Sequence, residues 1–294
     1  MNAITQAAAR GKRLLALGAG LLASSAALAA EPVRWQLNMP EGVTRTAENA
    51  YSMHMIMLWI CVFIGLVVFG AMAVAMFKFR KSQGAKPDTN FTHSTLLEVI
   101  WTAIPILILV VMAVPATTRV MEQYDAKGHE MTVKVTGYQW MWRYEYVGEG
   151  VNFVSRLDRE SDRIRQSGVV PGTDEHPHYL REVDRPLVLP VGTKVRFVFT
   201  ADDVIHAWWV PALGWKQDAI PGMVTEAWTE LAEPGVYRGV CAELCGKDHG
   251  FMPIVVKAVS KAEFQAWLAA TQAGDDVEAA RIAASAPAVA GSEG

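Results

Sequence analysis

Two long apolar runs occupy the first half of the chain. Residues 49–77 contain no Asp, Glu, Lys or Arg, and a second uncharged run covers residues 99–118, with Pro105 and Pro115 inside it. Each run is long enough to cross a hydrocarbon core about 30 Å thick, and proline is tolerated in membrane helices. The pattern therefore predicts a hairpin of two transmembrane helices, over residues 49–79 and 94–118.

The charges between these runs predict their orientation. A single acid, Asp88, is accompanied there by four basic residues, namely Lys78, Arg80, Lys81 and Lys86. An excess of Lys and Arg in a short loop marks the cytoplasmic side of a membrane. We therefore expect residues 80–93 to form a cytoplasmic loop in the inner membrane of a bacterium, with both ends of the mature chain in the periplasm.

The first 29 residues have the three parts of a secretory signal peptide. Arg10, Lys12 and Arg13 precede an apolar run over residues 14–28, and Ala27-Leu28-Ala29 matches a cleavage site of small residues. The apolar run is shorter than the roughly 20 residues that span a bilayer, so a short membrane anchor is the weaker alternative. Residues 30–48 are then expected to form a periplasmic segment before the first span.

A strand-like pattern begins at Met131. Aromatic residues alternate with other residues from Tyr138 to Tyr146, and more short apolar runs follow, at residues 186–191, 194–200, 204–210, 224–231, 236–240 and 254–259. Alternation with period two is typical of strands, and short strands between Pro and Gly turns favour a sandwich or barrel. We expect an all-β domain over residues 128–260. A capping box at Ser260 and Glu263 predicts a terminal helix, and the rest of residues 261–294 is expected to be a disordered tail.

Composition limits the classes of function. The chain has 294 residues, of which 51% are hydrophobic, and a net charge of -3. No basic tract is present that would follow a phosphate backbone, so we expect no nucleic-acid partner. The length leaves room for one ordinary domain besides the apolar segments. The expected organisation is a membrane-anchored protein with one periplasmic domain.

Most of the soft metal-ligand chemistry lies in residues 241–252. Two thiols, an imidazole and a thioether occur there, and an earlier predicted strand offers a second imidazole; these donors belong to Cys241, Cys245, His249, Met252 and His206. Such donors favour copper, zinc or an iron–sulfur cluster, and Met beside Cys and His is typical of copper. The residues alone leave two alternatives open, a disulfide between the cysteines and a Cys2His2 zinc site.

The spacing C-x-E-x-C-x3-H-x2-M over residues 241–252, with His206 upstream, resembles that of subunit II of the haem-copper cytochrome c oxidases. The resemblance implies a cupredoxin-like Greek-key barrel and a dinuclear copper centre, CuA, in which both cysteines bridge two copper ions. It places His206 and Met252 on one ion, and His249 with the backbone carbonyl of Glu243 on the other. It also implies a Mg2+ or Mn2+ ion, shared with subunit I, at the Glu243 carboxylate.

The resemblance also assigns roles outside this motif. Trp140, in the segment Gln139-Trp140-Met141-Trp142, matches the tryptophan through which electrons enter, although Met141 replaces the usual aromatic residue. Glu98, three residues before Trp101, matches the carboxylate at the mouth of a proton pathway. Acids on the same domain as the copper motif are expected to dock basic cytochrome c, and the candidates are Glu145, Asp184 and Asp203.

The function implied by the resemblance is that of the electron-accepting subunit of a respiratory cytochrome c oxidase, which reduces O2 to water and pumps protons in subunit I. The expected partners are subunit I with its haem and CuB, subunit III, cytochrome c and membrane lipid. A quinol oxidase subunit would not need the copper ligands. The hairpin with Glu98 and Trp101 favours the oxidase over nitrous oxide reductase and a copper-containing nitric oxide reductase. A copper-delivery protein would release its metal readily, whereas six donors are suited to retaining it.

Overall fold

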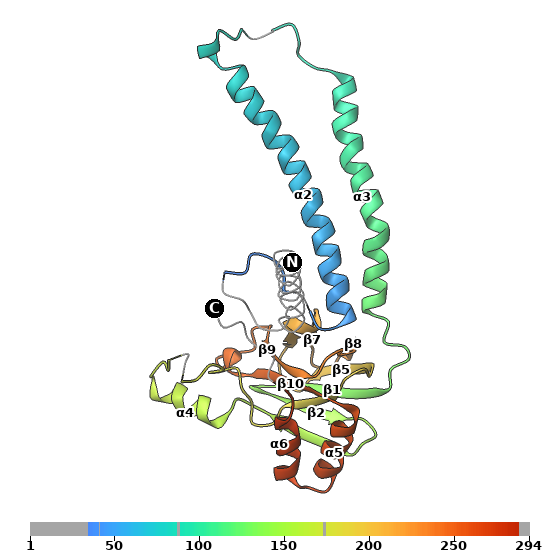
Figure 1. Ribbon diagram of the computed structural model, residues 1–294, viewed down its shortest axis with the longest axis vertical. Coiled ribbons are helices and arrows are strands. Elements are labelled where there is room, and N and C mark those ends of the chain that lie inside the picture. The colour runs from blue at the N-terminus through green and yellow to red at the C-terminus, as the bar shows by residue number, and fades with distance from the viewer. Residues whose placement is uncertain (1–34, 41, 87–88, 173–174, 288–294) are drawn as a thin grey trace, which may run out of the picture. The chain divides into compact units, whose positions relative to one another are not determined.

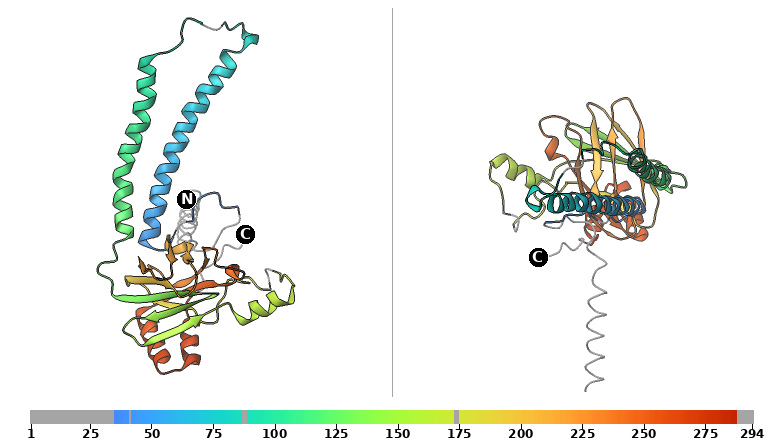
Figure 2. Two further views of the ribbon diagram at one scale, coloured as in Figure 1. Left: turned by 180° about the vertical axis from the view of Figure 1, so that it is seen from behind. Right: turned by 90° about the horizontal axis from the view of Figure 1, so that it is seen from above.

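The computed structural model describes residues 35–40, 42–86, 89–172 and 175–287. The predicted signal peptide lies outside the described residues, as does Asp88 of the predicted cytoplasmic loop. The chain forms two units, one of residues 49–125 and one of residues 1–48 and 126–294, and each is described by itself. Long helices form the first unit, and two β-sheets form the centre of the second (Figure 1 and Figure 2).

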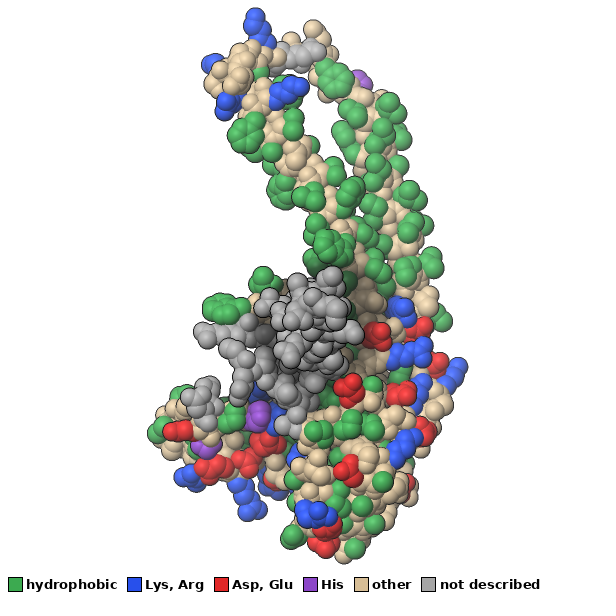
Figure 3. All heavy atoms as spheres, in the orientation of Figure 1, with side chains coloured by type: hydrophobic (Ala, Val, Ile, Leu, Met, Phe, Trp, Pro, Cys, Tyr) green, Lys and Arg blue, Asp and Glu red, His purple; other side chains and the backbone are tan. Residues whose placement is uncertain are grey.

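The first unit is a pair of apolar helices. Helix α2 (Arg45–Lys78) and helix α3 (Thr95–Gln123) are each long and apolar enough to cross a membrane, and a short 3-10 helix, η1 (Lys81–Gln83), lies between them. Helix α3 continues through Pro105 and Pro115. Figure 3 shows hydrophobic side chains along both helices and basic side chains near the turn. Both predicted helices are therefore present, and α3 continues past residue 118, where its predicted span ends.

The second unit is an all-β domain of two five-stranded sheets. The first has the order β3 (Val151–Ser155), β2 (Met141–Tyr146), β1 (Met131–Tyr138), β5 (Val195–Ala201) and β8 (Thr225–Thr229). The second has the order β4 (Leu187–Pro190), β10 (Pro253–Val259), β9 (Gly235–Cys241), β6 (His206–Val210) and β7 (Trp215–Ala219). The pairs β1–β5 and β4–β10 are parallel, and the other pairs are antiparallel. The predicted fold class, a helical hairpin followed by an all-β domain, is confirmed.

Aromatic side chains fill the space between the two sheets. Alternate residues of β5 are buried, as expected for a strand with one face on the core. Phe197 of β5 packs against Trp208 of the other sheet, with ring centroids 5.4 Å apart, and Trp208 stacks on Trp215 at 5.3 Å. Large rigid rings that pack across both sheets give the strand ends little freedom. The loops at those ends are therefore carried by a stiff framework.

Three local predictions are wrong. The run from Tyr138 to Tyr146 was expected to be one strand, but it is the end of β1, a turn at Gln139 and Trp140, and β2, with Tyr138 opposite Met141. Strands β3 and β7 lie where no strand was predicted. The expected tail after the terminal helix contains a second helix, α6 (Asp276–Ala284).

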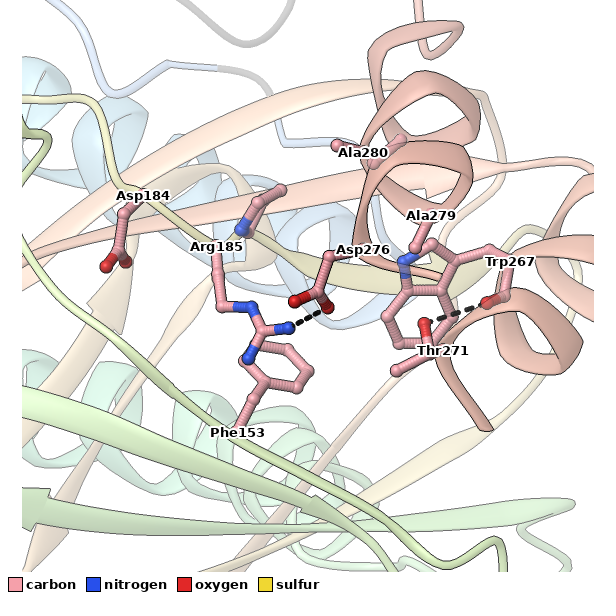
Figure 4. A pocket seen from close by; sticks show the side chains of 10 residues that line it. Phe153, Asp184, Arg185, Trp267, Thr271, Asp276, Ala279 and Ala280 are labelled. Atoms are coloured by element: carbon pink, nitrogen blue, oxygen red, sulfur yellow. Dashed lines mark hydrogen bonds and ion pairs between the residues drawn. The ribbon is translucent and has the colours of Figure 1, made fainter. Parts of the chain in front are cut away.

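Helix α6 is ordered because it packs on α5 (Lys261–Gln272). The predicted capping box at Ser260 starts α5. Figure 4 shows Arg185 reaching toward Asp276 at the start of α6, beside the ring of Phe153, and these two charged side chains form an ion pair. Ala279, Ile282 and Ala283 of α6 are buried. The part of the predicted tail that forms α6 therefore belongs to the folded domain.

Candidate metal centre

The predicted metal donors lie on two neighbouring strands and one loop. His206 is the first residue of β6 and Cys241 is the last residue of β9. These strands pair with Trp208 opposite Cys241, and the amide of Ala242 donates to the carbonyl of Ala207 at 2.9 Å. The ladder therefore brings a histidine and a cysteine together although they are far apart in the sequence. The other donors follow in the segment of residues 242–252, which we call the copper loop.

The sulfur of Cys241 lies beside three other donors. Its Sγ atom is 3.9 Å from Nδ1 of His206 and 3.4 Å from the backbone carbonyl oxygen of Glu243. Sγ of Cys245 lies 3.9 Å away, and both cysteines are free thiols. A disulfide holds its sulfurs about 2.05 Å apart. The two sulfurs are therefore separate donors, and the disulfide alternative is wrong in this structure.

The sulfur of Cys245 contacts the remaining two donors. Its Sγ atom is 3.5 Å from Sδ of Met252 and 3.5 Å from Nδ1 of His249, which lies in the 3-10 helix η3 (His249–Phe251). The resemblance assigned one of these donors to each copper ion, as it did for the neighbours of Cys241. Each cysteine sulfur thus contacts one donor of each predicted ion, which is the arrangement that two bridging thiolates require.

The donor set fits copper. The donor atoms of His206, Cys241 and Cys245 all lie within 4.8 Å of one another, and Met252 is 1% exposed. Thiolates, imidazoles and a thioether are the ligands that copper electron-transfer sites use. A structural zinc site closes with four donors, whereas six predicted donors meet here. The chemistry of the site therefore suits a pair of copper ions better than one zinc ion.

The two thiols differ in acidity. Burial raises the pKa of Cys241, but hydrogen bonds with His206 and with backbone groups outweigh burial and lower this pKa. Burial and the negative charge of Cys241 raise the pKa of Cys245. Two adjacent thiolates therefore need compensating positive charge. A bound metal cation would supply that charge.

Asp203 orients His206. Its Oδ1 atom lies 2.9 Å from Nε2 of His206, so that Nδ1 of the same ring faces Cys241. Asp203 also accepts hydrogen bonds from the backbone amides of Gln139 and Val204, both at 2.6 Å. Burial opposes the charge on Asp203, but these hydrogen bonds lower its pKa. For His206, burial also opposes the charge, but the hydrogen bonds with Cys241 and Asp203 raise its pKa.

Gly137 makes room for the ring of His206. A Cβ atom at this position of β1 would lie 2.7 Å from Cδ2 of His206, and real Cβ atoms essentially never approach another heavy atom so closely. Gly137 was not among the predicted site residues. Its only signal is a glycine inside a predicted strand, which indicates the close approach of another group.

The backbone carbonyl of Cys245 accepts two hydrogen bonds from the β1–β2 turn. Nε2 of Gln139 donates at 2.9 Å and the indole Nε1 of Trp140 donates at 3.2 Å. Trp140 is partly buried, whereas Trp142 is fully buried, and the ring of Trp142 meets that of His206 edge-on with centroids 5.8 Å apart. The predicted point of electron entry therefore contacts a predicted copper ligand directly.

Most of the chain is similar to known proteins of one family. Residues 131–259 match the family described as cytochrome c oxidase subunit II, periplasmic domain, and residues 32–118 match the corresponding transmembrane domain. The probable cytochrome c oxidase subunit 2 of Rickettsia felis is 38% identical over 258 residues, which are 88% of this chain and 79% of that protein. The chain belongs to the cytochrome c oxidase subunit II family.

Other members of the subunit II family are similarly related. Cytochrome c oxidase subunit 2 of Cereibacter sphaeroides is 35% identical over 274 residues, which are 87% of this chain and 89% of that protein. The crystal structure of the periplasmic domain of subunit II of cytochrome oxidase of Bradyrhizobium japonicum is 38% identical, with a TM-score of 0.43, and covers 51% of this chain and 98% of that domain.

Membership of the subunit II family confirms several predictions. The chain is a subunit of cytochrome c oxidase with a role in electron transfer, so the quinol oxidase, nitrous oxide reductase, nitric oxide reductase and copper-delivery alternatives are wrong. The family implies copper binding and association with other oxidase subunits. The two apolar helices and the β-domain make the chain a membrane protein with a soluble C-terminal domain.

Three predicted site residues of this subunit II chain are not among the metal donors. Glu98 lies in the first turn of α3, in the helical unit. Glu145 pairs with Lys134 at 3.8 Å, and Asp184 pairs with Arg156 at 3.3 Å. Exposed pairs of this kind are screened by solvent. The proton-pathway role of Glu98 and the docking roles of Glu145 and Asp184 therefore stay predictions.

Proposed function

We propose that the chain accepts electrons from reduced cytochrome c at a dinuclear copper centre and passes them to haem in subunit I of a bacterial cytochrome c oxidase. There, O2 is reduced to water and protons are pumped. The observation that carries the proposal is the contact of both cysteine sulfurs, Cys241 and Cys245, with one donor from each of the two predicted ligand sets.

The residues that would hold copper divide into bridging and terminal donors. Cys241 and Cys245 would be the bridging donors, and His206, Met252, His249 and the carbonyl of Glu243 would be the terminal donors. When bound, the copper pair supplies a one-electron redox unit whose charge is shared over two ions. The protein keeps the donors dry and fixed, because Cys241, Cys245 and Met252 are all under 5% exposed and a rigid scaffold limits the reorganisation that electron transfer requires.

Trp140 and the proteins that surround this subunit complete the proposed path. The indole of Trp140 receives the electron from cytochrome c and delivers it through its hydrogen bond to the carbonyl of Cys245, 3.2 Å away. Glu145, Asp184 and Asp203 are proposed to attract basic cytochrome c, although each of them is also bonded within this chain. Subunit I, with its haem and CuB, and subunit III are the proposed membrane partners.

Two glutamates are proposed to have further roles, one in binding a second kind of metal ion and one in taking up protons. The side chain of Glu243 is exposed, and we propose that it holds Mg2+ or Mn2+ against subunit I, since hard oxygen donors suit these ions. Glu98 is proposed to take up protons, because an ionisable group in a membrane span is often part of a proton path. The proposed orientation puts the loop of residues 80–93 in the cytoplasm and the β-domain in the periplasm.

The copper content and the spectrum of the full-length chain test the proposal. Loaded with copper in detergent, the chain should hold two copper ions and give a seven-line electron paramagnetic resonance pattern, because one electron is shared by two nuclei. Cys245→Ser should abolish this pattern. Cys61→Ser is the matched control, since Cys61 lies in the middle of α2. A four-line pattern or a single bound copper in the unmodified chain would refute the proposed function.

A further inference from the structure

The segment between β3 and β4 carries a short helix that contacts the copper loop. Helix α4 (Arg159–Ser167) begins at Asp158, whose carboxylate accepts hydrogen bonds from the amides of Glu160 and Ser161, and it ends at Gly168 in the left-handed region. The two ends of the segment pair with each other, because Leu157 bridges Val183 and the amide of Asp184 donates to the carbonyl of Arg156 at 3.0 Å. The segment that carries α4 is therefore closed at its base by backbone pairing.

Arg165 joins α4 to the copper loop. Its guanidinium donates to Oδ1 of Asp162 in the same helix, at 2.7 and 3.1 Å, and to Oδ1 of Asp248 in the copper loop at 3.1 Å. It also lies over the ring of Phe251, 4.3 Å from the centroid. Both charged partners are partly shielded, since the side chains of Arg165 and Asp248 are 26% and 23% exposed. One side chain thus makes an ion pair and a cation–π contact with the loop.

The two contacts are placed next to predicted copper ligands. Asp248 immediately precedes His249, and Phe251 immediately precedes Met252. The backbone bonds of this segment are local, from the amide of His249 to the carbonyl of Gly246 and from the amide of Phe251 to the carbonyl of Asp248. These bonds close the turn of η3, but they do not tie it to the rest of the domain. Arg165 ties both ends of the turn to α4.

We propose that Arg165 is a positioning residue for the copper centre, and that it holds His249 and Met252 in place through Asp248 and Phe251. The inference rests on the proposed copper function. The loop has two other anchors. Gln139 and Trp140 of the β1–β2 turn hold the carbonyl of Cys245, and the indole of Trp142 donates to the carbonyl of Met252 at 3.4 Å. The loop is therefore held by the β-domain at Cys245 and Met252, and by α4 at η3.

Helix α4 offers a matched control for Arg165. Arg163 has the same side chain two residues earlier, but it is 73% exposed and pairs with Glu160. In the copper-loaded full-length chain, Arg165→Gln should release copper to a chelator about 10-fold faster, as expected when a residue that supports a ligand is lost. It should also change the hyperfine spacing of the copper spectrum. Arg163→Gln should match the unmodified chain in both measurements, and equal behaviour of the two variants would overturn the inference.

Hydrogen exchange tests the same inference without copper. In the copper-free full-length chain, Arg165→Gln should speed exchange at the amides of His249 and Phe251, whereas Arg163→Gln should not. Unchanged exchange would overturn the inference even if the unmodified chain shows the dinuclear spectrum. Faster exchange in a chain that never binds two copper ions would refute the proposed function, while the mechanical link from Arg165 to the loop would stand.

Two more variants guard against a general loss of folding. Arg165→Lys keeps the charge beside Asp248 but loses the planar group that stacks on Phe251, so copper release should be intermediate. The double variant with Arg165→Gln and Asp248→Asn should release copper no faster than the faster of the two single variants, because both substitutions break the same ion pair. Additive effects of the two changes would show that Arg165 does not act through Asp248.

Discussion

The indole of Trp140 donates a hydrogen bond to the backbone carbonyl of Cys245, with Nε1 and O 3.2 Å apart. The contact joins a partly exposed aromatic ring on the β1–β2 turn to a buried cysteine in the copper loop. Gly246, next to that cysteine, lies against the same ring, where a Cβ atom would come within 3.1 Å of Trp140 Cζ2. The ring and the loop are therefore in direct contact.

Replacing Trp140 should separate electron entry from copper binding. Trp140→Leu removes the aromatic ring and the N–H donor, while the carbonyl of Cys245 still accepts a hydrogen bond from Gln139 at 2.9 Å. We expect slower reduction of the copper centre by cytochrome c in the assembled oxidase, with unchanged copper content. Stopped-flow absorbance and metal analysis measure these two quantities. Loss of copper would instead indicate that Trp140 mainly supports the fold of the site.

Gly137 should not tolerate even one added methyl group. In Gly137→Ala, the new Cβ would lie 2.7 Å from the ring of His206, so the ring or the strand must move. Overpacking of this kind costs about 1–3 kcal/mol, and displacement of His206 should also weaken copper binding. Thermal denaturation and copper titration of the full chain are the measurements. Gly172→Ala is the control, because no atom lies within 4 Å of its Cβ position; similar losses in both variants would contradict the argument.

The overall architecture could be predicted because it depends on local patterns. The uncharged runs match α2 and α3, and most of the predicted strands match strands of the two sheets. The β1–β2 turn could not be found from periodicity. Val135 of β1 pairs with Tyr144, and Gly137 pairs with Trp142, so the buried face is at odd positions in β1 and at even positions in β2. Tyr138 continues the aromatic alternation, but it lies on the other face, against Arg143.

The metal donors were visible in sequence, whereas the residues that support them were not. Four donor side chains fall within residues 241–252, and the spacing identifies them. Asp203 was predicted to dock cytochrome c, because a sequence shows only that an acid is present and not which way it faces. Arg165 acts on a loop 83 residues away in the sequence. Helix α6 was missed because its order depends on packing against α5, which local sequence patterns do not show.

The stability of α5 should depend on pH through Glu263. Hydrogen bonds from the side chain and backbone of Ser260 lower the pKa of Glu263, below its unfolded value of about 4.3. The stabilising contribution is therefore complete above that value and is lost as the pH falls through the lower folded pKa. At pH 7, Glu263→Gln should lower the free energy of unfolding of the full chain by roughly 0.5–1 kcal/mol, and its thermal midpoint with it. At strongly acidic pH the substitution should have little effect. Ser260→Ala also removes the hydroxyl that accepts from the amide of Glu263, so part of its destabilisation should remain in acid. For Glu263→Gln, a difference from the unmodified chain that persists undiminished in acid would exclude this linkage.

Asp203 has two predicted roles, and one substitution separates them. Asp203→Asn keeps the size of the side chain but removes the negative charge that lies 2.9 Å from Nε2 of His206. If the carboxylate orients and polarises this ligand, copper affinity should fall about 10–100-fold. The reduction potential of the centre should rise, because the negative charge that stabilises the oxidised ions is lost. Redox titration of the copper absorbance measures the potential.

The control for Asp203 is its neighbour Asp202, which is exposed. Asp202→Asn removes the same charge from the same surface, so both variants should raise the KM for cytochrome c if the acids only steer the partner. Only Asp203→Asn should also change the potential. A raised KM in both variants with the potential unchanged in both would show that Asp203 serves docking alone, and that the orientation of His206 is set by the packing of its ring against Gly137 and Trp142.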